Sequence, residues 1–251
     1  MPTHYPRTMR EKENRMTNCN APEHQTTRRI LPIACATALA LAFTASLPQP
    51  AHAGEVTVPA VPHNIRVDPP NKAFLVGHAV GTQNYVCLPS ATSATGVAYA
   101  LFTPEATLFD DLDKEIITHN FSPNPFETNT NPALVAIGPI RATWQFKDTS
   151  IIWGKVRPAD PNIPGDLGDA STDPNFVAQG AIAWLKVTAT GTEDGPTGGD
   201  KLTKTTFVQR LNTAGGVAPS TGCNAPADVG HQAFVPYTAD YFFYTNPDAA
   251  Y

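Results

Sequence analysis

Short runs rich in valine, threonine and aromatic residues recur along the chain from residue 73 onward, separated by loops rich in proline and glycine. The stretch Ala181–Cys223 shows this pattern most clearly. Alternate residues from Ala181 to Ala189 are apolar and would share one face of a strand, and Phe207 and Leu211 would share a face of the next strand. No run of helical period appears after residue 53. The pattern predicts a single all-β domain, an antiparallel β-sandwich or barrel with long loops.

Further strands are expected before and after the two strands of the stretch Ala181–Cys223, and their ends are expected at glycines and prolines. Two strands are predicted around a turn at Gly81-Thr82, and Pro104 is expected to end the strand that follows them. The expected strands outside the stretch Ala181–Cys223 are 73–80, 83–88, 97–102, 106–109, 115–119, 134–138, 141–147, 150–156 and 237–244. The loops 120–132 and 160–174 are longer than connections need to be, which makes them candidates for a functional role.

The beginning of the chain has the features of a secretory signal peptide. Arg28 and Arg29 precede the apolar run Ile30–Leu47, and the small-residue segment 51–53 (Ala-His-Ala) follows as a cleavage site. The arginine pair also partly matches a twin-arginine signal, so both export routes stay open. We expect the mature protein to begin near Gly54 and to be periplasmic or extracellular.

These features divide the chain into a removed leader (1–53), an extended N-terminal arm (54–72) and a β-domain (73–251). The leader contains six of the 17 Lys and Arg residues and three of the 22 Asp and Glu residues. The remainder therefore has 11 basic and 19 acidic residues, a net charge of −8. An acidic chain without a basic cluster argues against nucleic acid and anionic membrane surfaces as partners. Because the apolar run belongs to the leader, stable membrane insertion is not expected either.

Only two cysteines remain after the leader, which carries Cys19 and Cys35. In an oxidising compartment, two cysteines are most simply explained as one disulfide. A metal-binding or redox pair would favour a CxxC spacing, which is absent. The sequence therefore predicts a disulfide between Cys87 and Cys223.

Several blocks together resemble one family of secreted bacterial and fungal proteins, the domain of unknown function 3455, over about residues 65–245. These blocks are 81–87 (GTQNYVC), 102–109 (FTPEATLF), 142–144 (ATW), 181–185 (AIAWL), 208–210 (VQR), 213–216 (TAGG) and 237–244 (YTADYFFY), together with His119 and Cys223. The resemblance implies an exported domain but no particular activity. The family places a His-Tyr pair just before a Gly-Pro-x-Trp segment. Here Asn120 follows His119 and an insertion precedes Trp144, so the resemblance does not predict a site with these two side chains close together.

Five residues are the candidate binding residues: Gln83, Tyr85, His119, Trp144 and Arg210. No catalytic residue, metal ligand or cofactor is predicted. The sequence lacks a GxSxG elbow and the G-x-G-x-x-G fingerprint of a dehydrogenase. The histidines 78, 119 and 231 lack the spacing of zinc ligands, and the acidic loop 191–201 lacks the order of a calcium loop.

The residues favour a non-catalytic envelope or extracellular binding module. Its partner would be a small molecule, a glycan or an envelope ligand, contacted through the long loops. The alternative is an extracytoplasmic enzyme or metal-binding protein centred on His119 and nearby carboxylates. Convergence of the three histidines in the fold would favour the alternative.

Overall fold

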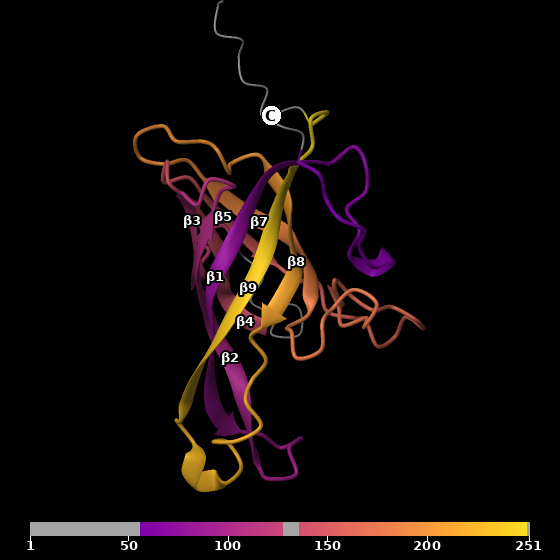
Figure 1. Ribbon diagram of the computed structural model, residues 1–251, viewed down its shortest axis with the longest axis vertical. Helices are drawn as coiled ribbons and strands as arrows, with labels where there is room; N and C mark the ends of the chain where they lie inside the picture. The colour runs from indigo at the N-terminus through magenta and orange to yellow at the C-terminus, as the bar shows by residue number, and fades with distance from the viewer. Residues whose placement is uncertain (1–55, 128–135, 250–251) are drawn as a thin grey trace, which may run out of the picture. The chain divides into compact units, whose positions relative to one another are not determined.

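The computed structural model describes residues 56–127 and 136–249, and strands dominate this part of the chain (Figure 1). Its nine strands are β1 (Lys72–Pro89), β2 (Val97–Phe109), β3 (Glu115–Pro123), β4 (Ala136–Phe146), β5 (Ile151–Lys155), β6 (Ala170–Ser171), β7 (Trp184–Glu193), β8 (Thr205–Gly215) and β9 (Gln232–Thr245). Two short 3₁₀ helices, η1 (His63–Ile65) and η2 (Pro226–Asp228), accompany them. The predicted leader lies outside the described residues.

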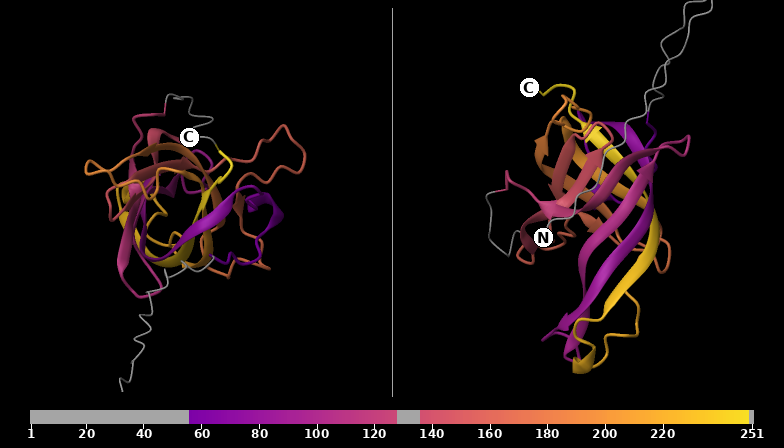
Figure 2. Two further views of the ribbon diagram at one scale, coloured as in Figure 1. Left: turned by 90° about the horizontal axis from the view of Figure 1, so that it is seen from above. Right: turned by 90° about the vertical axis from the view of Figure 1, so that its left-hand side faces the viewer.

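The strands form a closed antiparallel barrel. Their order in the sheet is β5-β4-β3-β2-β1-β9-β8-β7-β6, and a further pairing between β5 and β7 closes the ring. Strand β6 stays outside the ring because it pairs only with the first residues of β7, whereas β5 pairs with the rest. The barrel of the described residues therefore has eight strands, and Figure 2 shows it end-on. The prediction of an all-β sandwich or barrel is confirmed, in its barrel form.

Large side chains fill most of the barrel interior because alternate residues of each strand point inward. The main core cluster includes Leu108, Ile117, Trp144, Tyr241 and Phe243, all of them almost completely buried. Burying one side chain of this size contributes about 1.5–3 kcal/mol to folding. In the described part of the chain, the barrel interior is thus filled largely by a packed core.

A second apolar cluster lies on the outer face of β8 and β9, where the N-terminal segment covers the barrel wall. Ile65 of η1 is fully buried there against Leu211 and Phe242. The buried amide of Gln209 donates a hydrogen bond of 2.6 Å to the Ile65 carbonyl, and its oxygen accepts one from the Tyr244 hydroxyl. The segment is therefore anchored to the wall by both apolar and polar contacts.

Strands β1, β2 and β9 continue beyond the barrel as a three-stranded ribbon, at the lower end of Figure 1. The Cys87–Cys223 disulfide joins β1 of this ribbon to the connection between β8 and β9, with the two Cα atoms 5.5 Å apart. The backbone of Cys87 also exchanges hydrogen bonds with the connection, from its N–H to His231 O and from Gly230 N–H to its own carbonyl. The predicted disulfide is confirmed.

Two expected strand ends are wrong. Gly81 does not make a turn but lies in the middle of β1, opposite Ala106. A Cβ atom at this glycine would lie 2.1 Å from the Glu105 carbonyl oxygen, so the glycine allows β1 and β2 to approach closely. Pro104 likewise lies inside β2. Because β3 pairs with β2 only from Ala106 onward, this proline occupies a stretch of β2 that has one strand partner and tolerates a missing N–H.

The first part of the expected loop 120–132 is also strand. Strand β3 continues to Pro123, since residues 120–123 pair with Thr143 through Ile140 of β4. Residues 128–135 lie outside the described part of the chain, and with them residues 134 and 135 of the expected strand 134–138; the rest of that strand belongs to β4. The hairpin turn at residues 147–149 is confirmed, and Phe146 and Ser150 are hydrogen-bonded across it.

Candidate functional site

An apolar cavity of about 390 Å³ occupies the end of the barrel interior from which the ribbon projects. Its walls come from β1, β2, β3, β4, β5, β7, β8 and β9, and partly exposed Leu101 and Ile140 mark its open side. All five candidate residues lie in its wall: Gln83, Tyr85, His119, Trp144 and Arg210. The barrel therefore brings together side chains that are up to 127 residues apart in the sequence.

His119 and Trp144 form the inner part of this wall. They face each other across the β3–β4 pair, and their rings stack in parallel with centroids 4.5 Å apart. The fold thus overcomes the insertion between them, because the strand register sets their contact. The His119 Nδ1–H donates a hydrogen bond of 2.8 Å to the Thr143 carbonyl, which leaves Nε2 without a proton. Burial lowers the pKa of His119 to about 3, so the ring is neutral.

Arg210 supplies positive charge to the cavity. Its Nε and Nη2 both donate to the Ala183 carbonyl oxygen, at 3.2 and 2.9 Å. Among the described residues, no carboxylate lies within 4.0 Å of this guanidinium. Its charge acts across the cavity: it adds to the burial that lowers the pKa of His119, and it partly offsets the burial that raises the pKa of Tyr85 and Tyr241.

Gln83 and Tyr85 line the wall where β1 enters the ribbon, two residues apart and therefore on the same face of the strand. The Tyr85 hydroxyl donates a 2.6 Å hydrogen bond to the Gly216 carbonyl. The Gln83 side chain is buried and interacts with the Tyr237 phenol. The buried Trp144 Nε1 has no hydrogen-bond partner in the described part of the chain.

A pair of tyrosines forms another part of the interior. The hydroxyls of Tyr237 and Tyr241 lie 3.1 Å apart, and Tyr241 also faces the cavity. Burial raises the pKa of both phenols, with the neighbouring phenol adding to the rise at Tyr237. Both therefore stay neutral and act as hydrogen-bonding groups and not as charges.

Arg141 and Lys155 also line the cavity and were not among the predicted residues. The buried Arg141 guanidinium lies 3.0 Å from the Glu127 carboxylate, and the Lys155 ammonium lies 3.8 Å from the same oxygen. Arg141 is the only charged residue of the segment 136–146 (AIGPIRATWQF). A single charge in such a strand is the sequence signal that could have identified Arg141 as a site residue.

The histidines do not converge. His78 lies on the outer face of β1, where its Nδ1 is 2.7 Å from Asp240 and its Nε2 is 2.9 Å from Asp111. These two hydrogen bonds raise its pKa, Asp111 contributing most. His231 lies in the connection before β9, near Asp228, and not beside His78 or His119. Within residues 56–127 and 136–249, no group of three or more His, Cys, Asp or Glu residues could hold a metal ion.

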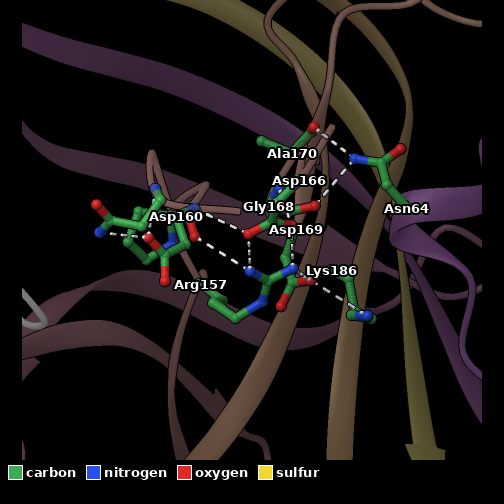
Figure 3. A network of polar contacts seen from close by, with 10 residues as sticks. Asn64, Arg157, Asp160, Asp166, Gly168, Asp169, Ala170 and Lys186 are labelled. Carbon is green, nitrogen blue, oxygen red and sulfur yellow. Dashed lines mark hydrogen bonds and ion pairs between the residues drawn. The ribbon is translucent and has the colours of Figure 1, made fainter. Parts of the chain in front are cut away.

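The long loop 160–174 is held by a polar network against the segment that precedes β1 (Figure 3). Arg157 binds Asp166 through both terminal nitrogens, at 2.6 and 2.9 Å, and this pairing lowers the pKa of Asp166. The Asn64 amide donates to the carbonyls of Gly168 and Ala170. These contacts give the loop a structural role, as a fastening between the barrel and the N-terminal segment.

The fold and the site thus define a closed antiparallel barrel protein with an apolar cavity inside it. Residues 69–245 match the family described as "Protein of unknown function (DUF3455)", which is more than half of the chain, and the protein belongs to that family. No curated protein and no solved structure matches the chain. In the described residues, no helix has the length and apolar character needed to cross a membrane.

Proposed function

We propose that this protein is an exported, non-catalytic binding module that holds a small, largely apolar molecule inside its barrel. The observation that carries the proposal is the cavity of about 390 Å³ with an apolar wall and a few polar groups. This size and composition are typical of small-molecule sites, and eight-stranded barrels are wide enough to hold one such ligand. The proposal places the ligand between strands and not on the long loops.

The chemistry of the cavity favours binding over catalysis. A general base works best when its pKa is near the working pH, and burial holds the pKa of His119 at about 3. The tyrosine phenols are held neutral by burial as well. An enzyme centred on His119 would need a nearby carboxylate, and the described residues that line the cavity include none.

Filling the cavity should abolish binding of an apolar probe. In wild-type protein we expect the neutral fluorophore N-phenyl-1-naphthylamine to bind with one saturable site. Ala142 lines the cavity, so Ala142→Phe should remove this binding by occupying the space. Fluorescence titration measures the effect, and circular dichroism checks that the variant is folded. The matched control is Ala227→Phe, at an exposed position in η2, which should bind the probe like wild type. Equal binding by both variants would contradict the proposal.

Export should be visible at the N-terminus of the purified protein. The order of charged, apolar and small residues before Gly54 predicts removal of residues 1–53 during export. Intact mass measurement and N-terminal sequencing of protein from the cell exterior or periplasm should therefore find a start at or near Gly54. An Arg28→Gln/Arg29→Gln variant should accumulate inside the cell with its leader attached. A soluble wild-type protein that begins at Met1 or Met16 would contradict export.

A further inference from the structure

The lining of the cavity carries positive charge in addition to its apolar side chains. Among the described residues, the lining includes three cationic side chains, Arg141, Lys155 and Arg210, and no carboxylate. Glu127 lies behind two of them, within 4.0 Å of both Arg141 and Lys155. Arg210 has no such counter-charge in the described part of the chain, although it is half-buried in a protein with excess negative charge. Arg210 therefore presents a positive charge to the cavity that no carboxylate of the described residues neutralises, and an anionic ligand would supply that counter-charge.

The polar groups of the wall also include Gln83 and Tyr85. The Gln83 side chain is buried and interacts with the Tyr237 phenol. The Gln83 side chain lies near Gly216, whose carbonyl accepts the hydrogen bond from Tyr85, and Arg210 acts electrostatically on Tyr85. Gln83, Tyr85 and Arg210 therefore belong to one polar region of the wall.

We infer that the ligand of this cavity is an apolar carboxylate, a molecule with a hydrocarbon body and one anionic group that binds at Arg210. The hydrocarbon body would contact Leu185, Val187 and Ala142, and the carboxylate would accept hydrogen bonds from Arg210. This inference rests on the proposed function and narrows it to one class of ligand. It also explains why a barrel with an apolar cavity keeps an arginine in its wall, where an aliphatic residue would suffice for a neutral ligand.

Decanoate and decan-1-ol make a matched pair of probes, because they share the hydrocarbon chain and differ in the head group. Each is titrated against wild-type protein carrying N-phenyl-1-naphthylamine, below the micelle concentration, and isothermal calorimetry measures both directly. We expect decanoate to bind about 10- to 100-fold more tightly than decan-1-ol, the range that hydrogen bonds to a charged group provide. Equal affinity, or tighter binding of the alcohol, would overturn the inference and leave the proposed function intact.

Substitution of Arg210 then tests the contact itself. Arg210→Gln should lose most of the preference for decanoate while its affinity for decan-1-ol stays within about threefold of wild type, since the apolar wall is unchanged. Arg210→Lys, which keeps the charge, should retain part of the preference. The control is Arg66→Gln, an exposed arginine paired with Asp68 outside the cavity, which should behave like wild type. Equal weakening of both probes by Arg210→Gln would mean that Arg210 only supports the wall, and would overturn the inference. If the wild-type protein binds none of the probes, the proposed function itself is refuted.

Discussion

A Cys223→Ser variant is expected to unfold about 2–5 kcal/mol more easily than the wild type. The Cys87–Cys223 bond spans 136 residues, and a cross-link of this span restricts the unfolded chain strongly. The chain-entropy account gives about 5 kcal/mol for such a loop, and measured values are often smaller. Each kcal/mol corresponds to about 2–4 °C in a domain of this size, so the melting temperature should fall by roughly 5–15 °C. Calorimetry or thermal circular dichroism measures the shift.

Reduction separates the bond itself from the substitution. Wild-type protein treated with dithiothreitol should melt near the variant, whereas the same treatment should not move the variant further. Ser220→Ala, at an exposed position in the same connection, is the control and should melt like wild type. The barrel strands do not include Cys223, so the variant should keep the wild-type far-UV spectrum. An unchanged melting temperature after complete reduction would contradict the predicted role of the disulfide.

Acid should destabilise the protein through His119. Burial depresses the pKa of this side chain from 6.5 to about 3 in the folded state, whereas it is normal in the unfolded chain. Between these values the unfolded state binds one proton that the folded state does not bind. The contribution of His119 to the free energy of unfolding is therefore at its full value above about pH 6.5. It decreases as the pH falls towards 3, by about 1.4 kcal/mol per pH unit and by several kcal/mol in total.

Comparison with a His119→Gln variant isolates this effect from the titration of carboxylates. The glutamine amide can still donate towards the Thr143 carbonyl but does not titrate, so the variant should lose one proton from the pH dependence of its unfolding free energy. Urea unfolding at several pH values between 4 and 7 gives both slopes. The control is His63→Gln, at an exposed histidine of η1, which should leave the acid slope as in wild type. Parallel curves for wild type and His119→Gln would show that His119 does not titrate in this way.

The fold class was accessible from the sequence because strand period and loop composition are local properties. The ends of β1 and β2 were not, because they depend on neighbours. Glycine is common in turns, but Gly81 lies inside β1 and allows a close approach to Glu105 and Ala106. Pro104 is tolerated inside β2 because β3 pairs only further along that strand. Local rules for glycine and proline therefore predicted breaks where the tertiary structure permits continuity.

The sequence indicated which residues could form the candidate site but not where in the fold they would meet. Gln83 and Tyr85 share a strand face, and this relation is visible in the sequence as a spacing of two. The contact of His119 with Trp144 depends on the register of β3 and β4, which the sequence does not display across residues 124–135. The position of Arg210 opposite them depends on closure of the barrel between β5 and β7.

The pairing of β1 with β9 has a kinetic consequence. These strands run side by side from Lys72 opposite Thr245 to Val86 opposite Gln232, so the barrel cannot close before its last strand is available. Folding that depends on contacts between distant parts of a chain is slow, since the ends must find each other before their contacts stabilise anything. Until β9 arrives, one edge of β1 has no strand to pair with, and an unpaired edge is a site where chains aggregate. The last fourteen residues of the barrel thus determine how long the newly made chain stays vulnerable.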